Sequence, residues 1–272
     1  MNKLFLTLSL LALTAGSSHA TLIAYEGFNY PQGTALDSSA NTGTGWTTTW
    51  SSNTWRTNSS GFGEISTGLT YSTLLTGGQA ARNENNGNQS FRQFGAQGAV
   101  GTYWTSFLIR KDSTFTNSFG ISLFDGGTEH SFMGTTTSGG SFLGVAGQGG
   151  HISSTAVTAN QTEFFVARYD MDTQKAHFWL NPSLSGTPTD AIAFNSASGT
   201  SFTKFGFDRI RLGVFNNTEN AGSGYLDEFR LGTTFDDVAP VPEPSTWLGA
   251  GLLVGLVSWS QRKQFSKWCS RA

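Results

Sequence analysis

The chain has 272 residues with 16 Lys or Arg and 18 Asp or Glu, so its formal net charge at neutral pH is −2. Five of the basic residues lie in the two ends, which leaves 16 − 5 = 11 between Thr21 and Pro244 against all 18 acidic ones, a net charge of 11 − 18 = −7. This balance excludes nucleic acid as a partner, because binding to nucleic acid needs clustered Lys and Arg.

Residues 1–20 predict a secretory signal peptide. Met1–Lys3 is a short basic start, Leu4–Leu13 is an apolar core, and Ser18-His19-Ala20 places small residues before a cleavage point. The apolar core is too short to span a membrane stably. We therefore expect signal peptidase to cut between Ala20 and Thr21, and the protein to be exported.

Short runs of strand-forming residues follow, separated by turn signals. The predicted strands are 22–26, 102–110, 119–124, 130–134, 163–170, 175–180, 205–212 and 224–231. Asp125-Gly126-Gly127 predicts a tight hairpin, and the stretches 37–61 and 134–154, rich in Gly, Ser, Thr and Asn, predict loops. Apolar and charged residues alternate along Leu226–Leu231, as in a sheet with one wet face. The pattern indicates an all-β fold, an antiparallel sandwich or barrel.

Three tryptophans lie close together in the segment GWTTTWSSNTWR, at Trp46, Trp50 and Trp55. Exposed in a loop, they would form a platform on which the apolar faces of sugar rings can stack. Alternatively they fill the core, because large aromatic side chains carry much burial energy. The sequence leaves both interpretations open.

The body resembles a known class of domain. Ala24–Tyr30 (AYEGFNY), Gly43–Trp46 (GTGW) and Tyr225–Phe235 (YLDEFRLGTTF) are similar to parts of concanavalin A-like lectin/glucanase domains of the laminin-G-like type. The resemblance implies a concanavalin A-like antiparallel β-sandwich, a jelly roll, over residues 21–238. It implies a carbohydrate-related role only weakly, since one fold hosts many functions.

Catalysis on such a scaffold needs two carboxylates that flank the cleaved bond. The Glu-x-Asp-x-x-Glu stripe of jelly-roll glucanases does not occur in the chain. Asp227 and Glu228 are adjacent, so regular strand geometry predicts that they point to opposite faces. The sequence therefore favours a binding protein over an enzyme. A secreted glycoside hydrolase or lyase, built from carboxylates distant in sequence, is the alternative.

Calcium is a candidate ligand at two turns. Asp125 and Glu129 bracket the first, and Asp170 and Asp172 lie at the second. Calcium binds six to eight oxygen atoms, often in such loops. Aspartate is also a preferred turn residue, because its side chain accepts hydrogen bonds from nearby backbone. Both interpretations stay open, and no cofactor is required by any motif in the chain.

Residues 239–272 form a second targeting pattern. The motif Val241–Thr246 (VPEPST) precedes the apolar segment 247–260, and the basic tail 261–272 follows with the lone cysteine, Cys269. At 1.5 Å per residue a helix over the apolar segment reaches about 21 Å, against roughly 30 Å of hydrocarbon. We therefore expect a short hydrophobic helix that anchors the protein in the inner membrane only transiently.

These features resemble the PEP-CTERM sorting signal, whose namesake triplet is Pro242, Glu243 and Pro244 here. In that family an exosortase, a membrane transpeptidase, processes the signal. The resemblance implies that this chain is an exosortase substrate, held at the inner membrane and then moved to the cell surface or the extracellular matrix. There we expect it to bind carbohydrate or exopolysaccharide, or to serve an adhesive or structural role such as in a biofilm.

Overall fold

The computed structural model describes residues 21–51, 55–57, 67–83, 89–136, 140–145, 151–190, 200–215 and 222–241. The predicted signal peptide, including Ala20, lies outside these residues, as does the predicted sorting signal from Pro242 onwards, with Glu243, Pro244 and the segment 247–260. Within the described ranges, no helix is long and apolar enough to span a membrane.

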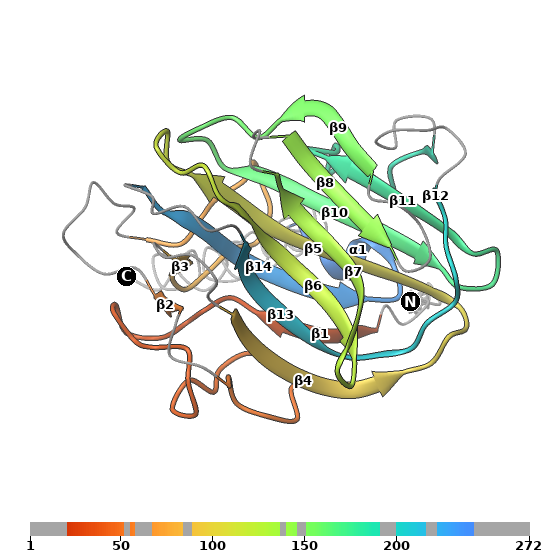
Figure 1. Cartoon of the computed structure of the whole chain (residues 1–272), viewed down its shortest axis with the longest axis horizontal. Coiled ribbons are helices and arrows are strands. Elements are labelled where there is room, and N and C mark those ends of the chain that lie inside the picture. The colour runs from red at the N-terminus through yellow and green to blue at the C-terminus, as the bar shows by residue number, and fades with distance from the viewer. Residues whose placement is uncertain are drawn as a thin grey trace, which may run out of the picture.

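The strands pair into two antiparallel sheets (Figure 1). The eight-stranded sheet has the order β12 (Thr200–Ser201), β11 (Lys175–Leu180), β10 (Glu163–Asp170), β5 (Thr102–Lys111), β14 (Gly224–Gly232), β3 (Ala81–Asn83) and β2 (Arg56–Thr57), with β1 (Leu22–Glu26) also paired to β14. The six-stranded sheet has the order β4 (Gln89–Gln97), β13 (Phe207–Phe215), β6 (Ser118–Asp125), β7 (Thr128–Thr135), β8 (Gly140–Val145) and β9 (His151–Ala156). The all-β antiparallel sandwich predicted from the sequence is confirmed.

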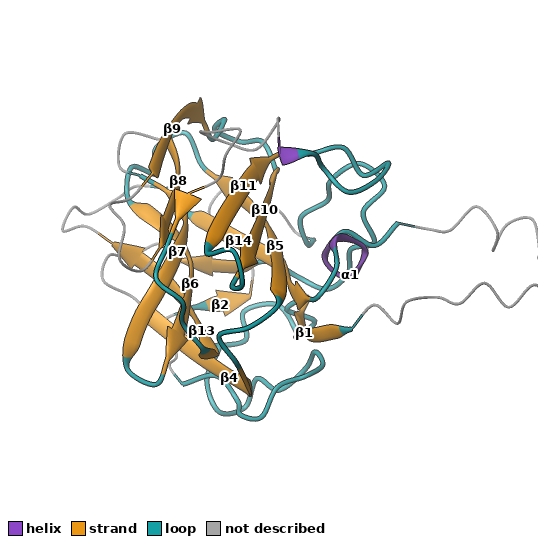
Figure 2. Cartoon of the chain, turned by 90° about the vertical axis from the view of Figure 1, so that its right-hand side faces the viewer, coloured by secondary structure: helices purple, strands orange, loops and turns teal. Residues whose placement is uncertain are grey.

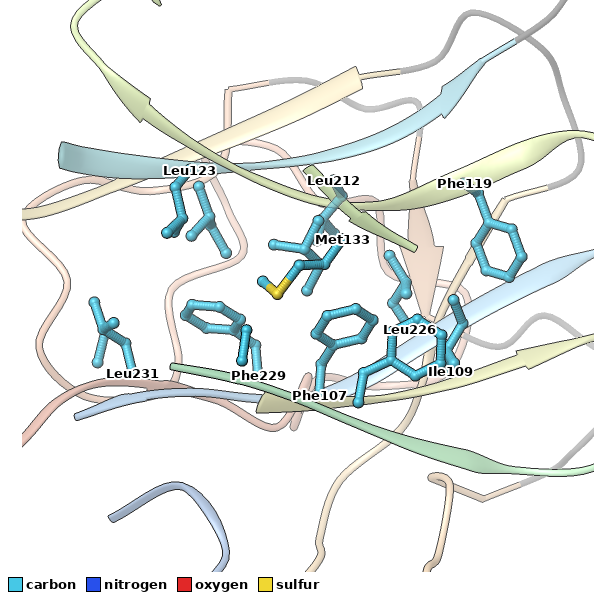
Figure 3. Close-up of a cluster of buried hydrophobic side chains, with 14 of the residues drawn as sticks. Phe107, Ile109, Phe119, Leu123, Met133, Leu212, Leu226, Phe229 and Leu231 are labelled. Carbon is cyan, nitrogen blue, oxygen red and sulfur yellow. The ribbon is translucent and has the colours of Figure 1, made fainter. Parts of the chain in front are cut away.

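The main core lies between the two sheets, where apolar side chains of alternate strand positions meet. Leu123, Met133 and Leu212 come from the six-stranded sheet and face Phe107 and Phe229 of the other (Figure 3). All five are buried. Alternation along β13 puts its other side chains on the outer face of the six-stranded sheet, where the candidate site lies.

A second apolar cluster covers the outer face of the eight-stranded sheet. Its members from the sheet are Trp104, Leu108, Phe164, Val166, Trp179 and Tyr225, and they pack against Leu69, Leu74, Phe235 and Val238. The covering residues belong to loop 67–80 and to α1 (Phe235–Val238), whose N-cap is Thr234. All nine residues of β14 are therefore buried, and the prediction that its charged face is wet is wrong.

Strands rich in aromatic and β-branched residues were predicted well. The bounds of β10 and β11 agree with the predicted ones, and Asp125 pairs with Thr128 across the predicted hairpin. The predicted loop 134–154 is wrong, because β8 and part of β9 lie within it. Glycine-rich strands carry little intrinsic strand signal, and pairing with neighbouring strands decides their conformation.

Candidate functional site

The tryptophan segment packs inward. Trp50 and Trp55 are 2% and 0% exposed and belong to the main core. Trp46 is half-buried, packs against the same core, and donates a hydrogen bond from Nε1 to the carbonyl of Tyr25 at 2.8 Å. The geometry matches the core interpretation of these residues, and their rings form no exposed platform for a ligand.

The polar residues between these tryptophans cover the edge of β4. The backbone N–H groups of Thr47 and Ser51 donate to the carbonyls of Gln93 and Phe91 at 2.9 and 3.0 Å. In return, Thr48 Oγ1 and Ser51 Oγ accept hydrogen bonds from the N–H groups of Gln93 and Phe91 at 3.0 and 2.9 Å. The segment thus closes an open sheet edge, which would otherwise invite pairing with another chain.

A buried ion pair between Glu26 and Arg92 joins β1 to β4. The carboxylate of Glu26 is 0% exposed and accepts hydrogen bonds from Arg92, from the Tyr30 hydroxyl at 2.9 Å and from the Phe28 N–H at 2.8 Å. The Arg92 guanidinium lies 4.7 Å from the centroid of the Trp46 ring. Burial raises the pKa of Glu26, although Arg92 opposes this. The network is closed to solvent, so it holds the fold and cannot reach a substrate.

A β-bulge reorients the two adjacent carboxylates of β14. Glu228 has a φ of 52°, and the register with β5 shifts between Asp227 and Arg230. Both carboxylates reach loop 67–80: Asp227 accepts from the N–H of Leu69 at 2.7 Å, and Glu228 accepts from that of Gly77 at 2.6 Å. The prediction that the two side chains point to opposite faces is therefore wrong, because it assumed an unbroken strand.

These carboxylates have the perturbed titration that is typical of catalytic acids. Burial, followed by the nearby charge of Glu228, raises the pKa of Asp227 well above its usual value, and burial likewise raises that of Glu228. Perturbed groups also occur in structural networks. Asp227 and Glu228 are 0% and 1% exposed, and their oxygens bind backbone N–H groups and Arg230. We therefore assign them to the fold and not to catalysis.

The three aspartates considered for calcium occupy turns. Asp170 Oδ1 accepts from the N–H groups of Asp172 and Thr173 at 3.1 and 2.9 Å, and Asp172 Oδ2 accepts from that of Gly101 at 3.2 Å. Asp125 is exposed at the end of its hairpin strand. No group of three or more His, Cys, Asp or Glu side chains able to hold a metal occurs in the described part of the chain. Hydrogen bonds from backbone N–H groups account for Asp170 and Asp172 at this turn. Calcium binding remains a prediction.

The candidate site is a cluster of four phenylalanines around one arginine, which we call the Arg211 cluster. It comprises Phe91 of β4, Phe124 of β6, Phe132 of β7, and Arg211 and Phe215 of β13. The register brings them together on the outer face of the six-stranded sheet, since Arg211 pairs with Phe91 on one side and with Ser122 on the other, and Ser122 pairs with Phe132.

The guanidinium of Arg211 lies between two rings, 4.7 Å from the centroid of Phe124 and 4.6 Å from that of Phe215. Each of these rings meets another edge-on: Phe91 with Phe124 and Phe132 with Phe215, both at 5.3 Å. Phe91, Phe132 and Phe215 are half-buried, so parts of their rings face solvent. The arrangement offers apolar surface held rigidly by cation–π and edge-to-face contacts.

Polar groups surround the rings. Arg211 donates to Glu129, to Ser122 Oγ at 2.9 Å and to Gln89 Oε1 at 3.4 Å. Burial lowers the pKa of Arg211, while the charge of Glu129 opposes the change. The Glu129 side chain is 38% exposed and Gln89 is also exposed, so both present oxygen atoms beside the aromatic surface. Apolar surface with a few placed polar groups is the usual composition of a ligand site.

Sequence reasoning missed this site. One signal was present, because the alternation Arg209-Ile210-Arg211-Leu212 puts both arginines on one face of a strand. The phenylalanines come from β4, β6, β7 and β13. Their proximity depends on strand order and register, which cannot be read from the sequence pattern.

No protein-family model matches the chain, and no curated protein matches it in sequence. Similar solved structures include a sialidase, with 10% identity and a TM-score of 0.42 over 68% of this chain and 17% of that one. The receptor-binding domain of botulinum neurotoxin D is 12% identical, with a TM-score of 0.42 over 66% of this chain and 46% of that one. Trypanosoma rangeli sialidase is 6% identical, with a TM-score of 0.44 over 78% of this chain and 30% of that one. The chain thus spans less than half the length of each. At these TM-scores the likeness assigns no function.

Proposed function

We propose that this chain is an exported protein of the cell surface or extracellular matrix, whose body binds carbohydrate through the Arg211 cluster. The single observation that carries this proposal is the half-exposed aromatic surface around Arg211 on the outer face of the six-stranded sheet. The corresponding face of the other sheet is filled by loop 67–80 and α1.

The chemistry of the cluster suits a sugar. Pyranose rings offer apolar C–H faces that pack on aromatic rings, and hydroxyl groups that need hydrogen-bond partners. Phe132 and Phe215 offer ring surface, and Glu129 and Gln89 offer oxygen atoms beside it. Phe215 is already held by Arg211, and Phe132 packs edge-on against Phe215. Binding would therefore order few side chains, which lowers its entropic cost.

The positions of the described ends suit display at a surface. Leu22 of β1 pairs with Gly232 of β14, and α1 starts three residues later at Phe235. Both elements lie on the side of the sandwich opposite the six-stranded sheet (Figure 2). A body held through its C-terminal segment would therefore present the Arg211 cluster away from the anchoring point.

The finer assignments belong to the same proposal. They are a concanavalin A-like jelly-roll topology, cleavage by signal peptidase between Ala20 and Thr21, and processing of a PEP-CTERM signal at Pro242, Glu243 and Pro244 by an exosortase. Their support is the sequence pattern at the two ends. Mass spectrometry of the exported protein tests them: we expect a new N-terminus at Thr21 and loss of 247–272, and retention of both ends would contradict export by this route.

A glycan array tests the binding function. The exported protein should bind at least one polysaccharide, and the double variant Phe132→Ala/Phe215→Ala should weaken that binding at least about tenfold, or about 1.4 kcal/mol. Tyr71→Ala is the matched control, because it also removes a half-buried ring, one that packs on Phe164 on the opposite side of the sandwich. Equal loss in both variants would contradict the assignment of the site.

The alternative of a glycoside hydrolase or lyase has less support. The carboxylates with raised pKa values, Glu26, Asp227 and Glu228, are all at most 1% exposed. Hydrolysis needs a carboxyl group on each side of a bound substrate. The described residues give no observation that favours this function over binding.

A further inference from the structure

We infer that the ligand of the Arg211 cluster is an uncharged polysaccharide rather than an acidic one. This inference rests on the proposed carbohydrate-binding function and narrows it to a ligand class. It follows from how the charges on the outer face of the six-stranded sheet are distributed and paired.

Both arginines on this face are already paired. Arg211 binds Glu129, and Arg209 binds Asp208 through two hydrogen bonds of 2.8 and 3.1 Å. Asp125, at the end of β6, adds a further negative charge close to Arg209. The two arginines and the three carboxylates together have a net charge of 2 − 3 = −1. A face with this balance exerts no attraction on carboxylate, sulfate or phosphate groups of an acidic glycan.

The arginine at the centre could bind an anion only at a high cost. Its side chain is 9% exposed, it lies between Phe124 and Phe215, and it donates hydrogen bonds to Glu129, Ser122 and Gln89. A carboxylate on the ligand would have to displace Glu129 and leave that charge without its partner. Arg211 thus orients the rings and Glu129, and it is not free to recognise an acidic sugar.

The groups that remain accessible suit hydroxyls. The exposed polar groups beside the rings are the Glu129 carboxylate and the Gln89 side chain, and the half-buried Gln93 lies next to Arg209 in the register. Carboxylate and amide oxygens accept hydrogen bonds from hydroxyl groups, and the carboxylate of Glu129 repels anions. An uncharged chain of hexoses or pentoses offers such donors together with the C–H faces that the phenylalanines need.

Titration calorimetry with a fixed panel of probes tests this inference on the full exported protein. The uncharged probes are a soluble mixed-linkage β-glucan and a galactomannan, and the acidic probes are alginate and polygalacturonate. We expect binding of an uncharged probe, with an affinity that changes less than about twofold between about 50 and 500 mM NaCl, because no charged pair forms. Phe132→Ala/Phe215→Ala should weaken this binding at least about tenfold, and Tyr71→Ala should leave it unchanged.

Two results would overturn different claims. Tighter binding of an acidic probe, weakened about tenfold or more by the higher salt concentration, would contradict the uncharged ligand and leave carbohydrate binding standing. Binding of none of the four probes, and of no glycan on an array, by protein that is folded by circular dichroism would overturn the proposed function itself.

A variant that removes the charge of Glu129 tests directly whether that charge excludes acidic polysaccharides. Glu129→Gln keeps the shape of the side chain but leaves Arg211 without its carboxylate partner, so the variant should gain salt-sensitive binding of polygalacturonate of at least about fivefold. Asp236→Asn is the matched control, because it removes the same charge from an exposed position in α1 on the opposite side. Equal gains in both variants, or a wild-type protein that already binds polygalacturonate as tightly, would contradict the inference.

Discussion

At the residue scale, Asp227 and Glu228 depart furthest from what their sequence suggests. Alternation along β14 predicts charges that face water, whereas both side chains are buried and accept hydrogen bonds from loop 67–80. Arg230 continues the network, since it donates to Glu228 at 2.8 Å and to the carbonyl of Leu75 at 2.9 Å. The N–H of Leu75 in turn donates to the carbonyl of Pro240 at 3.0 Å. These carboxylates therefore hold the loop beside Pro240, near the C-terminal end of the described residues.

The raised pKa of Asp227 predicts how its contribution to stability depends on pH. A carboxyl group with a higher pKa in the folded than in the unfolded state binds more protons when folded. Its contribution is therefore fully present below the unfolded pKa, about 3.9, and is lost as the pH rises towards the folded value. The difference in unfolding free energy between wild type and Asp227→Asn should therefore fall as the pH rises above about 4.

Urea unfolding at several pH values measures this difference. Taking the difference between the two proteins removes the effect of groups with the opposite shift, such as Asp208, whose pKa is lowered by its hydrogen bonds with Arg209. Parallel curves for wild type and variant would contradict a raised pKa at Asp227.

The ion pair of Glu26 and Arg92 predicts a large effect of removing one partner. Arg92→Met leaves the buried Glu26 carboxylate without its counter-charge and should cost about 3–5 kcal/mol of unfolding free energy. The double variant Glu26→Gln/Arg92→Met should recover part of that loss. Chemical denaturation measures both, with Arg56→Met, at an exposed position, as the control. A loss for Arg92→Met no larger than for the control would show that the pair does not stabilise the fold.

At the element scale, the segment 46–51 shows why the tryptophans were ambiguous. Trp46 and Trp50 point into the sandwich, and Thr48 and Ser51 point to the open edge of β4. The segment thus has a polar side and an apolar side, although it lies in none of the strands β1 to β14. Composition alone cannot distinguish such an edge cover from an exposed binding loop.

Replacing one of these hydroxyls should loosen the edge locally. Ser51→Ala removes the acceptor for the N–H of Phe91 and should cost about 1 kcal/mol. Hydrogen exchange of the Phe91 amide should become faster, and that of the central strand β6 should not change. Ser39→Ala is the control, because Ser39 binds only Asp37 in an exposed turn. Equal protection of Phe91 in wild type and Ser51→Ala would contradict the edge-cover role.

The extent to which the elements could be predicted follows from their composition. β10 (EFFVARYD) and β11 (KAHFWL) are rich in residues with strand propensity, and their bounds were predicted from the sequence. β4 (QSFRQFGAQ) and β8 (GSFLGV) are rich in Gln, Gly and Ser and were missed. Their strand conformation depends on pairing with β13 and β7, which is a property of the whole sheet. The Arg211 cluster depends on the same pairing.

At the scale of the whole molecule, the two faces of the sandwich differ in what covers them. The eight-stranded sheet carries loop 67–80 and α1 on its outer face, and the described ends of the chain lie on that side (Figure 2). The six-stranded sheet carries the half-exposed Arg211 cluster on its own outer face. This asymmetry separates the side that carries the described ends of the chain from the side that we propose binds polysaccharide.

Hydrogen exchange of the exported protein, measured with and without a bound polysaccharide, tests this separation most directly. We predict that the ligand slows exchange in peptides covering Ser118–Thr135 and Phe207–Phe215, which carry four of the five residues of the Arg211 cluster. Peptides from loop 67–80 and α1 should exchange at the same rate in both samples. Slower exchange confined to loop 67–80 or α1, with no change in β6, β7 and β13, would contradict the account.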